Sequence, residues 1–210
     1  MARKALIVLC VLGIITCTSI LVTSTKKDVT EYVHMVQVNK RIKEEKDTYV
    51  QASGSTVSKD VEILPTWIKE PTGLIDLPIM QYTDNSFYLE HDAEGNPSKY
   101  GAIFLDARCR VNDDVLLIHG HNTKSGDMFG FLKSYVRVDS FIDEHKIFEI
   151  SFGQNVKEYE VQGYTVIRDT DSLYLGSKVP YGYLDKGIIL STCYGDAGTS
   201  ERLILLLVEK

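Results

Sequence analysis

Cysteine is scarce in this chain of 210 residues, and basic residues do not outnumber acidic ones. The four cysteines are Cys10, Cys17, Cys109 and Cys193, and the first two lie in an apolar N-terminal segment. The remaining two are too few for a disulfide framework, although a single bridge between Cys109 and Cys193 stays open on the sequence alone. The net charge of −6 excludes a broad basic surface, so we expect no nucleic-acid partner.

Charge is missing altogether from one long run, residues 5–23, which follows Arg3 and Lys4 directly. A membrane-spanning helix needs roughly 20 apolar residues, whereas the apolar part of a signal peptide has only about 7 to 15. We therefore favour an uncleaved signal-anchor over residues 1–27, with a cleaved signal peptide as the alternative. The positive-inside rule favours a cytoplasmic N-terminus. We thus expect a single-pass protein of the cell membrane whose remaining domain is extracellular.

The rest of the chain has no internal repeat. The composition of the whole chain, 44% hydrophobic and 25% charged residues, is typical of one globular domain with an appendage. Residues 28–60 are expected to form a juxtamembrane helix and a linker, because the charge run at 40–47 suits a solvated helix face. Small residues at 52–58 indicate a flexible joint. Residues 61–210 are expected to form the globular domain.

Within residues 61–210, short apolar runs alternate with Gly, Pro, Asn and Asp turn signals, which predicts β-strands. One helix is predicted over 128–136, because its apolar residues recur at spacings of three and four. Many short strands and few helices favour a mainly β fold, either a closed barrel or a sandwich. The predicted strands are 61–69, 74–80, 87–90, 102–106, 114–119, 146–152, 156–168, 187–193 and 201–209.

The most informative of these strands, 187–193, places Cys193 at its C-terminal end. The segment 194–200 interrupts the pattern with two glycines, and Arg202 opens the next strand. If the two strands pair, Cys193 and Arg202 face each other, and a neighbouring cation favours a reactive thiolate. The alternative is a buried structural cysteine beside a surface arginine.

A second apolar strand leads to two histidines, His119 and His121, which share a face because strand side chains alternate. A histidine at a strand end is suited to acid/base chemistry, since its pKa lies near neutral pH. The alternative is a surface or packed histidine. Two histidines could also bind a metal, but no third ligand stands at a familiar spacing, so we expect no metal.

Cys193, His121 and Arg202 together supply the nucleophile, the acid/base and the oxyanion stabiliser that acyl transfer needs. A phosphatase also uses a cysteine and an arginine, but it holds them closer together than the nine positions between 193 and 202. Asp196 and Glu201 would moreover repel a phosphoryl dianion. We therefore favour acyl transfer.

In order and spacing, these motifs resemble those of the sortase family, and most closely class B. Leu190-Ser191-Thr192-Cys193 is similar to the family's T-L-x-T-C strand, with Ile189 in place of the leading Thr. Arg202 matches the arginine that opens the next strand, and Gly120-His121-Asn122 matches the G-H motif. The resemblance covers about residues 61–210 and includes further segments: Trp67-Ile68, Pro78-Ile79-Met80-Gln81, Asp84-Asn85, Tyr88-Leu89, residues 101–108, and Asp127-Met128-Phe129 with Leu132.

The resemblance implies a closed, mostly antiparallel β-barrel of about eight strands with a few short helices. It implies that Cys193 attacks the Thr carbonyl of a C-terminal sorting signal of the N-P-x-T type. His121 would be the general acid/base, and Arg202 would stabilise the oxyanion. The implied substrate-binding residues are Asn85, Ser191 and Thr192.

The implied partners are surface proteins that carry the sorting signal, together with an amine of peptidoglycan or of its lipid-linked precursor that resolves the thioester. The implied place is the outer face of a Gram-positive-type cell, and no cofactor is implied. Because the residues alone do not separate transfer from hydrolysis, a thiol peptidase that only hydrolyses stays open. A non-catalytic, anchored β-domain that binds a surface ligand is the other alternative.

The sequence departs from the class B pattern at three places. His119 stands where the family usually has Tyr. Only 19 residues, 168–186, connect two late strands where class B usually has a longer insertion, so residues 169–176 and 180–183 are expected to form the wall of the peptide pocket. Cys109 is an extra thiol beside Asp106 and Arg108, and we expect it to be an inert strand residue.

Overall fold

The computed structural model describes the backbone of residues 2–53, 66–180, 182–195 and 198–210, and the side chains of these residues except 2–15, 17, 19 and 49–53. The chain divides into two units, Met1–Gln37 and Val38–Lys210. The first unit consists of most of helix α1 (Ala2–Ser53). Among the residues described, no helix is long and apolar enough to cross a bilayer. Most of the 5–23 run lies outside the described side chains, so its role as a signal-anchor stays a prediction.

The second unit begins with the last part of α1, which packs on the β domain. Val38 is fully buried in a cluster of apolar side chains with Tyr88 and Phe104. Arg41 donates three hydrogen bonds to the carboxylate of Glu94, two to Oε1 at 2.8 Å and 3.0 Å and one to Oε2 at 2.8 Å. This end of the helix therefore belongs to the folded domain.

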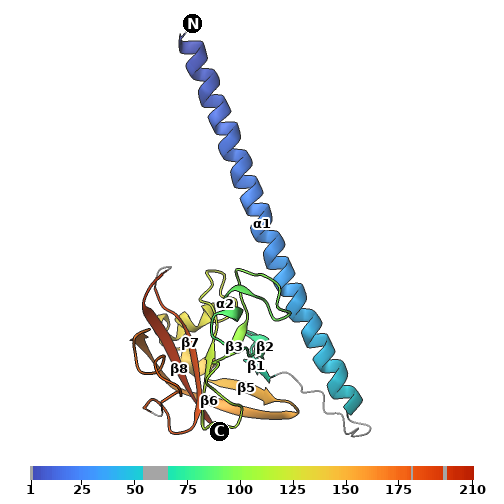
Figure 1. Cartoon of the computed structure of the whole chain (residues 1–210), viewed down its shortest axis with the longest axis vertical. Helices are drawn as coiled ribbons and strands as arrows, with labels where there is room; N and C mark the ends of the chain where they lie inside the picture. Colours follow the sequence, from blue (N-terminus) through green and yellow to red (C-terminus); the bar gives the residue numbers. More distant parts are fainter. Residues whose placement is uncertain (1, 54–65, 181, 196–197) are drawn as a thin grey trace. The chain divides into compact units, whose positions relative to one another are not determined.

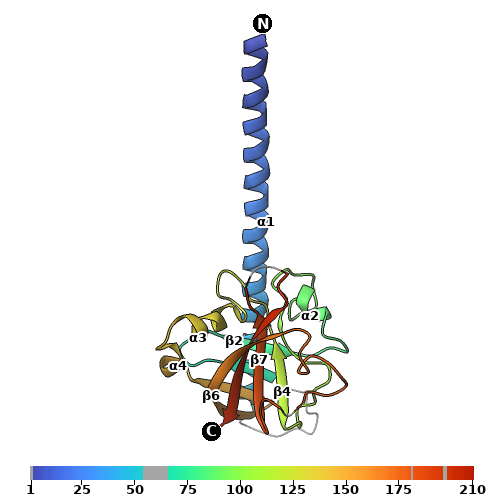
Figure 2. The same cartoon turned by 90° about the vertical axis from the view of Figure 1, so that its left-hand side faces the viewer.

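The β domain is a closed barrel of eight strands in the order β1-β2-β3-β4-β7-β8-β6-β5. Two neighbouring pairs, β2 with β3 and β4 with β7, are parallel, and the other pairs are antiparallel. Figure 1 shows β7 beside β8, and Figure 2 shows β4 beside β7. The mostly antiparallel barrel predicted from the sequence is confirmed. The strands are β1 (Thr66–Lys69), β2 (Asp76–Met80), β3 (Ile103–Leu105), β4 (Val115–His119), β5 (Ile147–Phe152), β6 (Asn155–Arg168), β7 (Gly187–Cys193) and β8 (Glu201–Glu209).

Eight of the nine predicted strands are present with bounds shifted by a few residues; the start of the first, 61–65, lies outside the described residues. The ninth, 87–90, is wrong, because Phe87–Glu90 forms one helical turn, α2. The turn begins where Asp84 Oδ1 accepts hydrogen bonds from the backbone N–H groups of Ser86 at 2.7 Å and Phe87 at 2.9 Å. A short polar side chain thus ties the backbone into a turn and overrides the strand propensity of the aromatic residues.

The predicted helix at 128–136 is present as the 3-10 helix η1 (Gly130–Lys133) followed by α3 (Ser134–Arg137). A further short helix, α4 (Phe141–Glu144), was not predicted and lies near α3 (Figure 2). Met128 precedes η1 with a positive φ of 52°, which keeps it out of the helix.

The two parallel strands β4 and β7 are buried on both faces. The first four residues of β4 and the first six of β7 are buried, and the strand ends are the first places where their side chains reach solvent. Parallel neighbours end at the same rim of the barrel. Polar residues at the ends of β4 and β7 must therefore gather there.

Candidate active site

Cys193 and Arg202 are directly opposite each other in the antiparallel ladder of β7 and β8. Directly opposed residues project from the same face of a sheet, so the thiol and the guanidinium share one side. Cys193 is exposed, whereas the six residues of β7 before it are buried. The structural-cysteine alternative is thus excluded by the position of the residue at the rim.

The two cysteines of the barrel are both free thiols. Cys109 is buried, and its Sγ accepts a weak hydrogen bond from the backbone N–H of Leu117 at 3.5 Å. Burial raises the pKa of the Cys109 thiol to about 11, which keeps the thiol protonated at neutral pH. Cys109 is buried and unreactive in character, as expected, but it lies between β3 and β4 and is not the strand residue that was predicted.

His121 reaches the same rim from the end of β4. The parallel register pairs His119 with Ser191, so two residues further along each chain bring His121 level with Cys193. Two hydrogen bonds continue the pairing beyond the strand end: Gly120 N–H donates to the Ser191 carbonyl at 3.2 Å, and Thr192 Oγ1 donates to the Gly120 carbonyl at 2.8 Å. Neighbouring strands lie about 4.8 Å apart, so the chain positions of His121 and Cys193 are side by side at the same rim.

A cavity of about 350 Å³ opens between these strand ends. It is lined by all six residues named as catalytic or substrate-binding: Cys193, His121, Arg202, Asn85, Ser191 and Thr192. Of the described residues in 169–176 and 180–183, which were expected to form its wall, only Asp169 and Tyr174 line it. The other lining residues are Leu89, Phe104, Asp106, Arg108, His119, Gly120, Asp169 and Tyr174. One concave surface thus contains a nucleophile, an imidazole and a permanent cation.

The backbone around α2 fixes the orientation of His121. Its Nε2 donates a hydrogen bond to the Leu89 carbonyl at 2.7 Å, because a carbonyl oxygen can only accept. In the neutral ring the lone pair then resides on Nδ1, which is the atom left for proton transfer. Gly101 makes this arrangement possible, since a Cβ there would lie 3.0 Å from His121 Cδ2 and 2.4 Å from the Tyr88 carbonyl oxygen.

Arg202 is held at the mouth of the cavity. Its Nη1 donates to the carbonyls of Thr199 at 2.7 Å and Glu201 at 2.9 Å, and its Nη2 lies 3.3 Å from Asp169 Oδ2. The loop after β7 and the 168–186 connection therefore both position the guanidinium. Asp169 was placed in the wall by the sequence analysis, but nothing in the sequence marked it as the partner of Arg202.

The predicted substrate-binding residues line the cavity, and their polar groups also bind the protein. Asn85 Nδ2 donates to Asp106 Oδ2 at 3.0 Å, while its Oδ1 accepts the N–H of Ala107 at 2.7 Å. Ser191 Oγ lies 2.7 Å from the Tyr174 hydroxyl. The structure brings these residues together around the cavity, and their contact with a substrate stays a prediction.

Comparisons with known proteins agree with this geometry. No family model matches the chain. Sortase B of Listeria monocytogenes is 36% identical over 102 residues, which are 48% of this chain and 40% of that protein. Sortase B of Staphylococcus aureus is 26% identical over 147 residues, 69% of this chain and 59% of that protein. The chain thus spans about half the length of the curated relatives it matches.

Solved structures extend the likeness over the barrel. The structure of sortase B from Listeria monocytogenes superposes with a TM-score of 0.57 and 26% identity, covering 70% of this chain and 95% of that one. A complex of Staphylococcus aureus sortase B with a substrate has a TM-score of 0.64 at 19% identity, covering 82% and 95%. The chain is thus similar in sequence to sortase B proteins and has the barrel fold of their solved structures.

One group of residues beside the cavity was not predicted as a functional unit. Asp106, at the end of β3, is buried, and its carboxylate accepts hydrogen bonds from Arg108 Nε at 2.8 Å and His119 Nε2 at 3.0 Å. Burial raises the pKa of Asp106, but these hydrogen bonds outweigh burial and hold the pKa well below its usual range. The spacing of Asp106 and Arg108 was part of the family resemblance, but no pattern in the sequence indicated that they pair with each other or that His119 binds the same carboxylate.

Proposed function

We propose that this protein is a cysteine transpeptidase of the sortase B type that cleaves a C-terminal sorting signal and transfers the protein to an amine of the cell wall. The observation that supports the proposal is the convergence of Cys193, His121 and Arg202 on one cavity of about 350 Å³. Cys193 and Arg202 come from β7 and β8, His121 comes from the segment just after β4, and together they supply the three roles of acyl transfer. The names of the relatives point to the same chemistry.

In the acylation step, the Cys193 thiolate attacks the carbonyl carbon of the substrate Thr, and a C–S bond forms. The carbonyl oxygen becomes an oxyanion, which Arg202 stabilises with a charged hydrogen bond. His121 in its protonated form then gives a proton to the leaving amine as the C–N bond breaks. The products of this step are a thioester on Cys193 and the released C-terminal peptide.

In the second step, an amine attacks the thioester carbonyl and His121 accepts the proton that the amine loses. The C–S bond breaks, a new amide forms, and the Cys193 thiolate is regenerated. Residues of the cavity wall, such as Leu89 and Tyr174, shield the thioester from water and favour the amine over hydrolysis.

The proposed substrate is a surface protein with a sorting signal of the N-P-x-T type, cleaved after Thr. Asn85, Ser191 and Thr192 would contact the peptide, since all three line the cavity next to Cys193. Staphylococcus aureus sortase B has been solved as a complex with a substrate, which supports a peptide-binding cavity in this fold. The amine acceptor would come from peptidoglycan or from its lipid-linked precursor.

The proposed location is the cell membrane, with residues 1–27 as a single-pass anchor and the barrel on the outer face of a Gram-positive-type envelope. The support is the run without charge at 5–23, which follows two basic residues. An enzyme placed there would meet both the secreted substrate and the wall precursor.

Mass spectrometry after incubation with a panel of sorting peptides, with and without an added amine, tests the proposal. We expect a mass increase on Cys193, an amine-dependent product, and loss of both in Cys193→Ala. Hydrolysis that an amine does not divert would instead indicate a thiol peptidase. If the wild-type protein forms no adduct, and the Cys193→Ala variant binds the peptides with the same affinity as wild type, the protein is a non-catalytic binding domain.

A further inference from the structure

We propose that the ion pair of Asp106 and Arg108 is a positioning device that holds Tyr174 in the wall of the peptide cavity and thereby sets the affinity for the sorting peptide. The inference rests on the proposed function for its substrate. Its structural part concerns only how the 168–186 connection is held, so it is measurable without any substrate.

The connection between β6 and β7 needs such a device. Its described residues, 169–180 and 182–186, contain turns and bends but no strand or helix. Such a segment has no ladder of backbone hydrogen bonds to fix it, and loops of this kind are commonly the most mobile parts of a fold. The connection nevertheless contributes Asp169 and Tyr174 to the cavity. Its turn hydrogen bonds, such as Tyr174 N–H to the Asp171 carbonyl at 3.0 Å, are local and do not tie residues 170–176 to the barrel. Contacts with side chains elsewhere in the barrel supply that link.

Arg108 makes these contacts on both sides of Tyr174. Its Nη2 donates to the carbonyl of Leu173 at 2.9 Å, and its Nη1 donates to the carbonyl of Leu175 at 3.3 Å. The backbone before and after Tyr174 is thus bound to one rigid, planar guanidinium. Because Leu173 is fully buried, the segment is also anchored by packing at this point.

Asp106 fixes the guanidinium that makes these bonds. Its Oδ1 accepts Arg108 Nε at 2.8 Å and its Oδ2 accepts Arg108 Nη2 at 2.8 Å, which is the two-pronged geometry of a strong ion pair. His119 and Asn85 donate to the same carboxylate at 3.0 Å each. The side chain of Asp106 is 1% exposed, and a buried carboxylate with this many donors has little freedom to move.

Tyr174 links the segment held by Arg108 to the cavity. Its hydroxyl lies 2.7 Å from Ser191 Oγ, and its ring centroid lies 6.3 Å from that of His119. Burial raises the pKa of Tyr174 to about 12, so the phenol stays neutral at physiological pH and keeps its hydrogen bond. Tyr174 thereby connects the wall to the strand that ends in Cys193.

The reacting groups are held by other contacts. Cys193 is fixed by the β7–β8 ladder, His121 by the Leu89 carbonyl, and Arg202 by the Thr199 and Glu201 carbonyls. Asp169, which also contacts Arg202, begins the connection, but its own N–H donates to the Ser200 carbonyl at 2.8 Å, so its place does not depend on Arg108 alone. Loss of the Asp106–Arg108 pair should therefore weaken peptide binding more than it slows the chemical steps. This separation distinguishes a positioning role from a general loss of structure.

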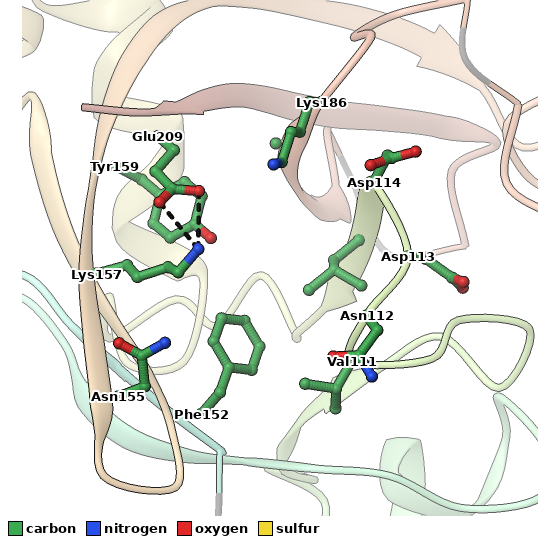
Figure 3. Close-up of a pocket in the computed structure, with 12 residues that line it drawn as sticks. Val111, Asn112, Asp113, Asp114, Phe152, Asn155, Lys157, Tyr159, Lys186 and Glu209 are labelled. Atoms are coloured by element: carbon green, nitrogen blue, oxygen red, sulfur yellow. Dashed lines mark hydrogen bonds and ion pairs between the residues drawn. The ribbon is translucent and has the colours of Figure 1, made fainter.

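Arg108→Lys is the main test variant, because lysine keeps the positive charge beside Asp106 but lacks the fork that reaches both carbonyls. Tyr174→Phe removes only the hydroxyl, and it tests the last contact without disturbing the ion pair. The matched control is Glu209→Gln, which removes a carboxylate paired with Lys157 at 2.9 Å. This ion pair lies in a hollow of about 260 Å³ where β4 and β7 begin, at the opposite end of the barrel from the active-site cavity (Figure 3).

The experiment combines steady-state kinetics on a sorting peptide, hydrogen exchange of residues 169–180, and the rate of Cys193 alkylation by iodoacetamide. For Arg108→Lys we expect a KM about tenfold higher, corresponding to the loss of one or two hydrogen bonds, and a kcat within about twofold of wild type. Exchange of residues 169–180 should be faster, and the alkylation rate unchanged. Tyr174→Phe should raise KM less, and Glu209→Gln should change none of these quantities.

Unchanged KM and unchanged exchange in Arg108→Lys would overturn the inference. A fall in kcat together with slower alkylation would also overturn it, because the pair would then support the nucleophile rather than the wall. If the wild-type protein forms no adduct with any sorting peptide, the proposed function fails and so does the affinity part of the inference. The exchange measurement still decides whether Arg108 holds the connection.

Discussion

Thr192 donates a hydrogen bond to the carbonyl oxygen of Gly120 across 2.8 Å, and this bond ties the strand end that carries Cys193 to the one that carries His121. Both partners are buried. Thr192 was predicted to bind substrate, and in the structure it also links the ends of the two strands. The bond is the most direct link between the nucleophile and the acid/base residue that the structure records.

Thr192→Val should therefore impair catalysis, although valine has nearly the shape of threonine. The substitution leaves the Gly120 carbonyl without its donor, at a cost of about 1–3 kcal/mol. We expect kcat/KM for a sorting peptide to fall by about tenfold, whereas Thr192→Ser, which keeps the hydroxyl, should stay close to wild type. Equal kinetics for the valine and serine variants would show that the bond does not position the pair.

Arg202→Ala should reduce the acylation rate by on the order of 100-fold or more, by analogy with the removal of one oxyanion donor. Single-turnover measurement of the Cys193 adduct gives this rate directly. Arg202→Lys keeps the charge but not the planar fork, and should recover part of the loss. Near-normal acylation in the alanine variant would remove Arg202 from its proposed role.

Gly101→Ala should destabilise the protein and disturb His121. The residue has a φ of +60°, and an added Cβ would meet the Tyr88 carbonyl at 2.4 Å and His121 Cδ2 at 3.0 Å. Gly126→Ala is a matched control, because its φ of +92° brings similar backbone strain but nothing lies within 4 Å of the new Cβ. We expect thermal unfolding to show that backbone strain lowers the free energy of unfolding by about 1–3 kcal/mol in both variants. Only Gly101→Ala should show a further loss of stability and a fall in activity.

The two barrel cysteines should differ sharply in reactivity. Cys109 is buried and its pKa is raised to about 11, whereas Cys193 is exposed at the rim. At pH 8, peptide mapping after brief treatment with iodoacetamide should find label on Cys193 and none on Cys109. Both should react in denaturant. Labelling of Cys109 in the native protein at a comparable rate would contradict the burial described above.

The stability that Asp106 contributes should depend on pH in one direction. Its folded pKa is depressed below the unfolded value of about 3.9, so the contribution is complete above that pH and is lost as the pH falls toward the folded pKa. Asp106→Asn should cost about 3–5 kcal/mol at pH 7, since it leaves Arg108 poorly paired. Urea unfolding at pH 7, 5, 4 and 3 gives the free energy of unfolding of both proteins. The difference between wild type and Asp106→Asn should be constant down to about pH 5 and smaller below pH 4.

The sequence predicted most of the site because the site is built on strand ends. The apolar run before Cys193 and the arginine nine positions later are local patterns, and antiparallel pairing then brings them opposite each other. The error at 87–90 arose because one hydrogen-bonding side chain, Asp84, outweighs the strand propensity of two aromatic residues. Such a competition is decided by a local bond between a side chain and the backbone, which a strand propensity does not include.

The role of Arg108 could not be predicted for a different reason. Its acceptors are the main-chain carbonyls of Leu173 and Leu175, more than 60 positions away, and every residue has a carbonyl. No side-chain pattern marks a segment whose backbone is the binding partner. The partner of Arg202 was missed in a similar way, because Asp169 lies 33 positions earlier in a connection without regular structure.

The parallel pairing of β4 with β7 gives the barrel two unequal ends. All groups proposed to react gather where these strands finish, and the hollow where they start contains the Lys157–Glu209 pair, near the β5–β6 hairpin (Figure 3). That far end is accordingly suited to the attachment of other molecules. A fluorophore, an immobilising tether or a fused cargo joined at the hairpin tip, residues 153–154, would leave the opposite mouth open to both substrates.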